Sequence, residues 1–337
     1  MKRADFLRNT GFALAASALQ ISAHAGNVSA ENVRRKILPP RLRPGDTVAL
    51  TAPAGAVFNP EGIEKGKSAL EAFGFRVRLC DSLYRKHGYF AGTDEERAKE
   101  LMQLFEDDNV HGIVAVRGGW GCARILPLLD FEKIAAHPKV ISGFSDITTL
   151  LLAIHAKTGI VTFHGPVGAS SWSELTNFSF KSSVMDAEMP RYKESSAIVL
   201  SKGKAEGELL GGNLTVLCSL IGTPWLPDFT DSILFLEETE EEPYSIDRML
   251  TQLKQSGMLS KAKGVVFGQC RKCEAEEPEK SFTFDEVMKQ HFSGLDIPVI
   301  SNYSFGHTVD KYTFPLGSRA RISTEDRSVE MLEASVK

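Results

Sequence analysis

The segment Val140-Ile141-Ser142-Gly143-Phe144-Ser145-Asp146 is the clearest indication of this chain's architecture. Its first five residues are apolar or small, as in a short buried strand. Residues 147–157 follow as a predicted helix, so Ser145 stands on the turn between a strand and a helix. A strand that runs through a tight turn into a helix is the repeating unit of a parallel α/β sheet.

The same alternation extends upstream of this turn. Strands are predicted over 47–51, 75–79 and 112–116, and helices over 62–73, 94–105 and 123–129. The second of these helices begins with a capping box, because Glu96 lies three residues after Thr93. We therefore predict a layered α/β domain with a mainly parallel sheet over residues 41–185.

Beyond about residue 185 strands dominate the pattern. Residues 186–194 read as a linker, and a second, β-richer domain is predicted over 195–335. Its expected strands cover residues 197–200, 233–236, 264–267 and 321–323.

The composition is that of an ordinary globular protein. The chain has 337 residues, 42% of them hydrophobic, and a net charge of -4 with a pI near 6.1. Nucleic-acid binders usually carry a basic face, and no long basic run occurs here. A small molecule or a peptide is the expected substrate.

The N-terminus resembles an export signal. Lys2, Arg3 and Arg8 precede an apolar run, and Ala23-His24-Ala25 supplies small residues for cleavage. We predict a signal peptide over 1–25, a linker over 26–40 and export to the periplasm. Ala4 stands where a twin-arginine signal has its second arginine, which leaves the export route open. The run is too short for a permanent membrane helix, and no cysteine follows it, so no stable membrane anchor is expected.

The five cysteines are scattered and odd in number. Cys270 and Cys273 form a lone CxxC, a weak signal for zinc or redox chemistry without a second pair of ligands. Export would permit a disulfide, but the sequence assigns none. We interpret the cysteines as structural.

Ser145 allows two interpretations. A nucleophile on a strand-to-helix turn is exposed to substrate, with Gly143 permitting close backbone approach and the helix N-terminus favouring an oxyanion. Only half of the G-x-S-x-G pattern is present, since Ile147 occupies its last position. Ser145 or Asp146 could equally cap the helix, and the local sequence alone favours the cap.

Two further regions are candidates for chemistry. The glycine cluster at 118–121 lies between a strand and a helix, where it could donate to an oxyanion, bind a phosphate or form a plain turn. Glu237 and Glu238 end an apolar strand, so either carboxylate could orient an imidazole or lie in a solvated acidic run. Of the eight histidines, His307 is the preferred base, with His164 as its rival.

Six motifs in order decide between these interpretations. Together they resemble the LD-carboxypeptidase family of serine peptidases, which includes microcin-immunity hydrolases, over about residues 40–330. The motifs are RGGWG at 117–121, GFSDIT at 143–148, FHGP at 163–166, GGNL at 211–214, FLEE at 235–238 with PYSIDRML at 243–250, and GH at 306–307 with PLG at 315–317.

The resemblance implies a catalytic triad of Ser145 as nucleophile, His307 as general base and acid, and Glu237 as the group that orients the imidazole. Glu238 remains the alternative acid. It also implies an oxyanion hole formed by the amide of Asp146 and that of Gly118 or Gly119. Residues expected to contact the substrate are Arg117, Trp120 and Asn213.

The implied reaction is hydrolysis of the L,D-amide bond that releases the terminal D-alanine of murein tetrapeptides. It requires no metal or organic cofactor, and the family implies a homodimer. Two alternatives remain open: hydrolysis of peptidyl or aminoacyl adenylates, as in the microcin-immunity branch, and non-catalytic muropeptide binding. The chain departs from the family pattern at Trp120, where relatives commonly have tyrosine, and over residues 310–312.

Overall fold

The computed structural model describes residues 35–337, of which residues 36–337 form one compact unit. The predicted signal peptide and residues 26–34 of the predicted linker lie outside the described residues. No helix within residues 35–337 is long and apolar enough to cross a membrane.

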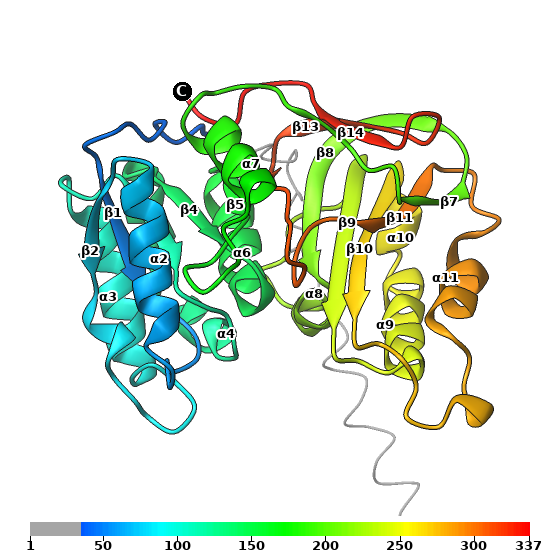
Figure 1. The fold of residues 1–337 in the computed structure, drawn as a ribbon, viewed down its shortest axis with the longest axis horizontal. Helices are drawn as coiled ribbons and strands as arrows, with labels where there is room; N and C mark the ends of the chain where they lie inside the picture. Colours follow the sequence, from blue (N-terminus) through cyan, green and yellow to red (C-terminus); the bar gives the residue numbers. More distant parts are fainter. Residues whose placement is uncertain (1–34) are drawn as a thin grey trace, which may run out of the picture. The chain divides into compact units, whose positions relative to one another are not determined.

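The first sheet has six strands in the order β12-β5-β4-β3-β1-β2. All neighbouring pairs from β5 to β2 are parallel, and β12 joins the edge antiparallel to β5 (Figure 1). The strands are β1 (Thr47–Thr51), β2 (Arg76–Leu79), β3 (Gly112–Ala115), β4 (Val140–Gly143), β5 (Thr162–His164) and β12 (Phe314–Leu316).

Helices connect and cover these strands, as the alternating pattern predicts. They are α2 (Glu61–Ala72), α3 (Asp94–Glu106), α4 (Cys122–Ile125), α5 (Phe131–Ala136), α6 (Thr148–Thr158) and α7 (Glu174–Val184), with 3₁₀ turns η1 (Asp81–Leu83), η2 (Leu126–Leu128) and η3 (Ser145–Ile147). The predicted capping box of α3 is confirmed. The helix predicted over 123–129 is shorter, because Pro127 cannot donate within it and η2 takes over.

The second sheet has eight strands in the order β6-β14-β13-β8-β9-β10-β11-β7. Its centre, from β8 to β11, is parallel, and the outer strands pair antiparallel. The strands are β6 (Arg191–Lys193), β7 (Ile198–Ser201), β8 (Lys204–Asn213), β9 (Ser232–Thr239), β10 (Gly264–Arg271), β11 (Val299–Tyr303), β13 (Arg319–Ser323) and β14 (Ser328–Met331).

Four helices accompany this sheet, with η4 (Pro278–Lys280) on a loop; α9, α10 and α11 lie on the side away from the first sheet (Figure 1). The helices are α8 (Leu214–Leu220), α9 (Pro243–Gln255), α10 (Met258–Lys261) and α11 (Phe284–Phe292). The predicted fold class is thereby confirmed: a mostly parallel α/β part is followed by a mixed, β-rich part.

The two sheets share a hydrophobic core. One buried cluster includes Ile141 on β4, Leu150 on α6 and Phe235 on β9. Helix α6 is buried on nearly all sides because it packs against β5 of the first sheet and β8 of the second. The C-terminal part of the chain returns to the first sheet, where β12 pairs with β5 and the buried Val336 joins the core. Strand β6 lies within residues 186–194, the predicted linker. The domain boundaries stay a prediction.

Candidate active site

Ser145 lies at the sharp turn between β4 and α6. Its backbone has φ of 63°, in the left-handed region that non-glycine residues rarely adopt. Gly118 packs directly against it: a Cβ on Gly118 would come within 2.8 Å of the Ser145 Cβ and 3.1 Å of the Asp146 amide nitrogen. Only glycine therefore allows the loop at 118–121 to approach the serine this closely.

Two buried side chains, Asp146 and Arg97, hold the C-terminal end of the glycine loop. The carboxylate of Asp146 accepts a hydrogen bond of 2.8 Å from the amide of Cys122, at the start of α4. Burial raises the pKa of Asp146, although that hydrogen bond acts in the opposite direction. Nη1 of the buried Arg97, on α3, donates hydrogen bonds to the carbonyl oxygens of Gly121 (3.0 Å) and Pro53 (2.7 Å). The hydrogen bond from Cys122 to Asp146 thus joins the serine turn directly to the end of the glycine loop.

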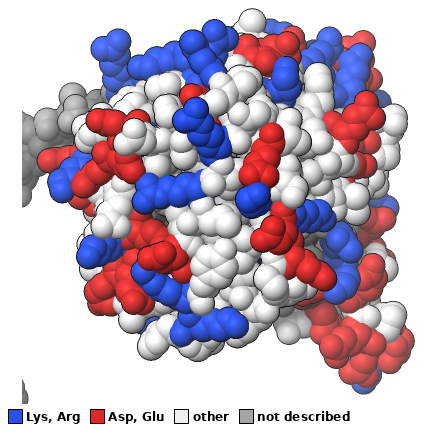
Figure 2. Space-filling view, turned by 60° about the vertical axis from the view of Figure 1, so that its left-hand side comes forward, with Lys and Arg blue, Asp and Glu red and all other residues white. Residues whose placement is uncertain are grey.

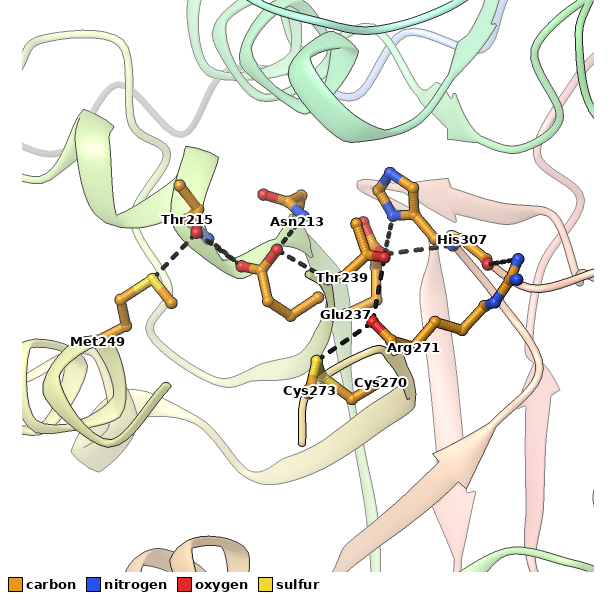
Figure 3. Close-up of a disulfide and its surroundings, with 10 residues drawn as sticks. Asn213, Thr215, Glu237, Thr239, Met249, Cys270, Arg271, Cys273 and His307 are labelled. Atoms are coloured by element: carbon orange, nitrogen blue, oxygen red, sulfur yellow. Dashed lines mark hydrogen bonds and ion pairs between the residues drawn. A yellow bond between two sulfur atoms is a disulfide. The ribbon is translucent and has the colours of Figure 1, made fainter. Parts of the chain in front are cut away.

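His307 and Glu237 meet above the end of the second sheet (Figure 3). Nδ1 of His307 lies 2.7 Å from Oε2 of Glu237, and the His307 amide donates to the same oxygen at 3.3 Å. Glycine makes room for this pair, since a Cβ on Gly306 would lie 2.2 Å from Oε2 of Glu237. Phe144 packs edge-on against the imidazole, with ring centroids 4.9 Å apart.

The hydrogen bond and the opposite charges of the pair, and not its burial, set the direction of both pKa shifts. Burial raises the pKa of Glu237, but the hydrogen bond and positive charge of His307 outweigh it, so the pKa is lowered. Burial lowers the pKa of His307, but the hydrogen bond and charge of Glu237 outweigh it, so the pKa is raised. A carboxylate held in its charged form against Nδ1 leaves Nε2 as the atom that can take up a proton.

The side chain of Glu238 points to the other face of β9, where it accepts hydrogen bonds from the first turn of α8. Its carboxylate accepts hydrogen bonds from the Asn213 side chain (2.9 Å), the Thr215 amide and hydroxyl (2.8 Å each) and the Thr239 amide (3.0 Å). Burial, together with the charge of Glu237, raises its pKa. Asn213 is itself buried and caps α8 by accepting from the Val216 amide. No hydrogen bond joins either side chain to His307 among residues 35–337, although the negative charge of Glu238 contributes to raising the pKa of His307.

His164, the rival histidine, is buried behind the pair at the end of β5. Its Nε2 lies 3.9 Å from Oε1 of Glu237, and neither ring nitrogen has a hydrogen-bond partner among residues 35–337. Burial lowers its pKa to about 4, so the ring is neutral near pH 7. It does not reach the cavity beside Ser145.

A cavity of about 540 Å³ opens between the serine turn and the histidine loop. Ser145, His307, Gly118 and Gly119 line it. Its other charged lining residues are four cations and one acid: Arg117, Arg271, Lys272, Lys311 and Glu240. On the face shown in Figure 2 the charges of both signs are mixed, whereas the charged side chains that line the cavity are mostly cations.

The structure thus brings together Ser145, His307, Glu237, Asp146, Gly118, Gly119 and Arg117 from the predicted set. Trp120 and Asn213 do not line the cavity; Trp120 is 52% exposed and packs edge-on against Phe90.

Four cations at or beside the site lie outside the predicted set: Arg97, Arg271, Lys272 and Lys311. Arg97 had a readable signal, because it is a charged residue on the buried face of α3, four positions before Leu101. Lys311, which donates to the carbonyls of Thr308 and Val309, has a pKa lowered to about 8 by burial. It and Arg271 reach the cavity only through the fold.

Comparison with known proteins agrees with this architecture. Residues 48–165 match the LD-carboxypeptidase N-terminal domain, and residues 206–322 match the LD-carboxypeptidase C-terminal domain. The probable murein peptide carboxypeptidase of Bacillus subtilis is 38% identical over 88% of this chain and 95% of its own length.

Solved structures share the fold. The muramoyltetrapeptide carboxypeptidase of Oxalobacter formigenes is 33% identical, with a TM-score of 0.73 over 85% of this chain and 97% of that one. The microcin C7 self-immunity protein MccF, known from Escherichia coli, has structures with a TM-score of 0.82 at 26% identity, over 89% of this chain and 100% of that chain. The chain therefore belongs to the LD-carboxypeptidase family and is a hydrolase of that family.

Proposed function

We propose that the protein is a serine carboxypeptidase that hydrolyses the L,D-amide bond of murein tetrapeptides and releases the terminal D-alanine. The observation that carries the proposal is the contact between His307 and the buried Glu237, in which Nδ1 lies 2.7 Å from Oε2. His307 and Ser145 line the same cavity. The relatives named as murein peptide and muramoyltetrapeptide carboxypeptidases support the choice of substrate.

In the proposed mechanism, Nε2 of His307 takes the proton of Ser145 as Oγ attacks the carbonyl carbon. Glu237 stabilises the imidazolium that forms and keeps the ring in the required orientation. The amide of Asp146, with that of Gly118 or Gly119, donates to the oxyanion. His307 then protonates the leaving amine, and water, activated by the same imidazole, releases the acyl group from Ser145.

The cations of the cavity support a substrate with free carboxylates. Arg117 is exposed at its rim, and its Nη1 donates only to the carbonyl of Ala56 (3.2 Å) among residues 35–337. We assign it the terminal carboxylate of the peptide, because a guanidinium retains further donors for a planar anion.

The likeness to MccF makes a peptidyl adenylate the second candidate. Stacking on adenine would need an aromatic side chain on the segment after Glu237, and Tyr244 is the one this segment offers. Tyr244 is 61% exposed but does not line the cavity, which favours the murein peptide.

The test is incubation of the purified protein with murein tetrapeptide and, separately, with a peptidyl adenylate, next to Ser145→Ala. We expect D-alanine release from the tetrapeptide and its loss in the variant. Turnover of neither substrate would refute the enzyme assignment, and turnover unaffected by the substitution would refute Ser145 as nucleophile. We further propose that residues 1–25 export the enzyme to the periplasm, where it meets wall peptides; fractionation of the producing cell tests this.

A further inference from the structure

Among residues 35–337, one disulfide joins Cys270, near the end of β10, to Cys273, which follows the strand. The two residues that it encloses, Arg271 and Lys272, both line the cavity. Figure 3 shows the disulfide on one side of Arg271 and His307 on the other. The remaining cysteines, Cys80, Cys122 and Cys218, are buried free thiols.

Arg271 connects the disulfide turn to His307 and to the segment that follows Glu237. Its carbonyl oxygen accepts hydrogen bonds from the hydroxyl of Thr239 (3.3 Å), the last residue of β9, and from the amide of Glu240 (2.9 Å), the residue after the strand. Its Nη1 donates to the carbonyl oxygen of His307 at 3.2 Å. Hydrogen bonds of Arg271 therefore link the turn to His307 and to the two residues 239–240, which lie just after Glu237 in sequence.

Of the two residues between the cysteines, Lys272 is paired with a carboxylate and, within residues 35–337, Arg271 is not. Nζ of Lys272 forms an ion pair of 2.6 Å with Glu240. Arg271 has no carboxylate within ion-pair distance among residues 35–337, and it is exposed to the cavity. Since one hydrogen bond to His307 uses a single N–H, most of the donors of this guanidinium remain available for a planar anion.

We propose that the turn Cys270–Cys273 is the specificity element of this site: Arg271 binds a carboxylate of the peptide other than the terminal one, and the disulfide holds Arg271 in place. This rests on the proposed function. The turn needs a constraint, because Lys272 has φ of 54°, a left-handed conformation that is costly for a non-glycine residue. A reduced turn can relax, and Arg271 then leaves both the cavity wall and His307.

The substrate side of the proposal is tested with two matched tetrapeptides. One has a free carboxylate on the residue upstream of the scissile bond, and the other has a carboxamide there. We expect Arg271→Ala to raise KM about tenfold for the first peptide and less than twofold for the second. Arg117→Ala should affect both peptides equally, because they share the terminal carboxylate. Arg76→Ala, an exposed arginine on β2, is the control without effect.

The disulfide side is tested with a small dithiol, which transfers two electrons and two protons to the Cys270–Cys273 bond and is itself oxidised to a cyclic disulfide. Reduction should raise the KM of the wild type for the carboxylate peptide about as much as Arg271→Ala does. Cys270→Ser/Cys273→Ser should show the raised KM already and should not respond to the dithiol, since the other cysteines are not bonded.

The outcomes separate the two proposals. A wild type without turnover on either peptide contradicts the proposed function. If the wild type is active, two results contradict the inference but leave the proposed function standing. One is that Arg271→Ala raises KM equally for both peptides. The other is that neither the dithiol nor the double serine variant changes KM.

Discussion

Exchanging the two adjacent acids of β9 for glutamine, one at a time, tests the site directly. Glu237 is fully buried and faces His307, whereas Glu238 is almost as buried and faces α8. Glu237→Gln keeps the shape of the side chain but removes the charge that stabilises the imidazolium. Glu238→Gln removes a charge of the same size only one residue away.

The magnitude follows from the geometry of the pair. Opposite unit charges about 4 Å apart at an effective dielectric constant of about 20 interact by about 4 kcal/mol. Loss of that energy in the transition state lowers kcat about 10³-fold, since each 1.4 kcal/mol is about tenfold. Glu238→Gln should leave kcat within about tenfold. It should lower the free energy of unfolding by about 1–3 kcal/mol. The NH2 group of the new glutamine side chain replaces an acceptor oxygen and then faces the N–H donors of Thr215 or Thr239, so buried donors lose their acceptor.

The assay is steady-state release of D-alanine from murein tetrapeptide, with thermal unfolding of each variant measured in parallel. A larger loss of kcat in Glu238→Gln than in Glu237→Gln, with both proteins folded, would refute the assignment of Glu237 as the acid partner of His307.

Three further changes have defined outcomes. Glu237 raises the pKa of His307, and only the neutral imidazole accepts the serine proton. The acidic limb of the kcat/KM profile should therefore lie above pH 6.5 and shift to lower pH in Glu237→Gln. A limb that does not shift contradicts this. Gly306→Ala should abolish turnover, because φ is +77° there and the new methyl would overlap Glu237; retained kcat in a folded variant would count against the geometry. His164→Phe should keep or raise the melting temperature, since it replaces a neutral ring with two unpaired buried nitrogens by an apolar one, and a marked loss of stability would show that the ring has a partner.

The sequence by itself determined the alternation of strands and helices in the first sheet and the start of α3. These features depend on hydrophobic periodicity and capping, which act between residues a few positions apart. The resemblance of six ordered motifs supplied the family, which the domain matches and the relatives confirm. The choice between nucleophile and helix cap at Ser145 was beyond its local sequence, because both roles need the same strand-to-helix turn.

Tertiary structure alone decided what stands around that turn. Glu237 and Glu238 are equivalent in sequence, but successive residues of a strand point to opposite faces, so only one meets His307. Arg271 and Lys311 reach the cavity because segments 126 and 166 residues after Ser145 fold back against it. Such contacts depend on how the two sheets pack, and no pattern within a short window of sequence encodes them.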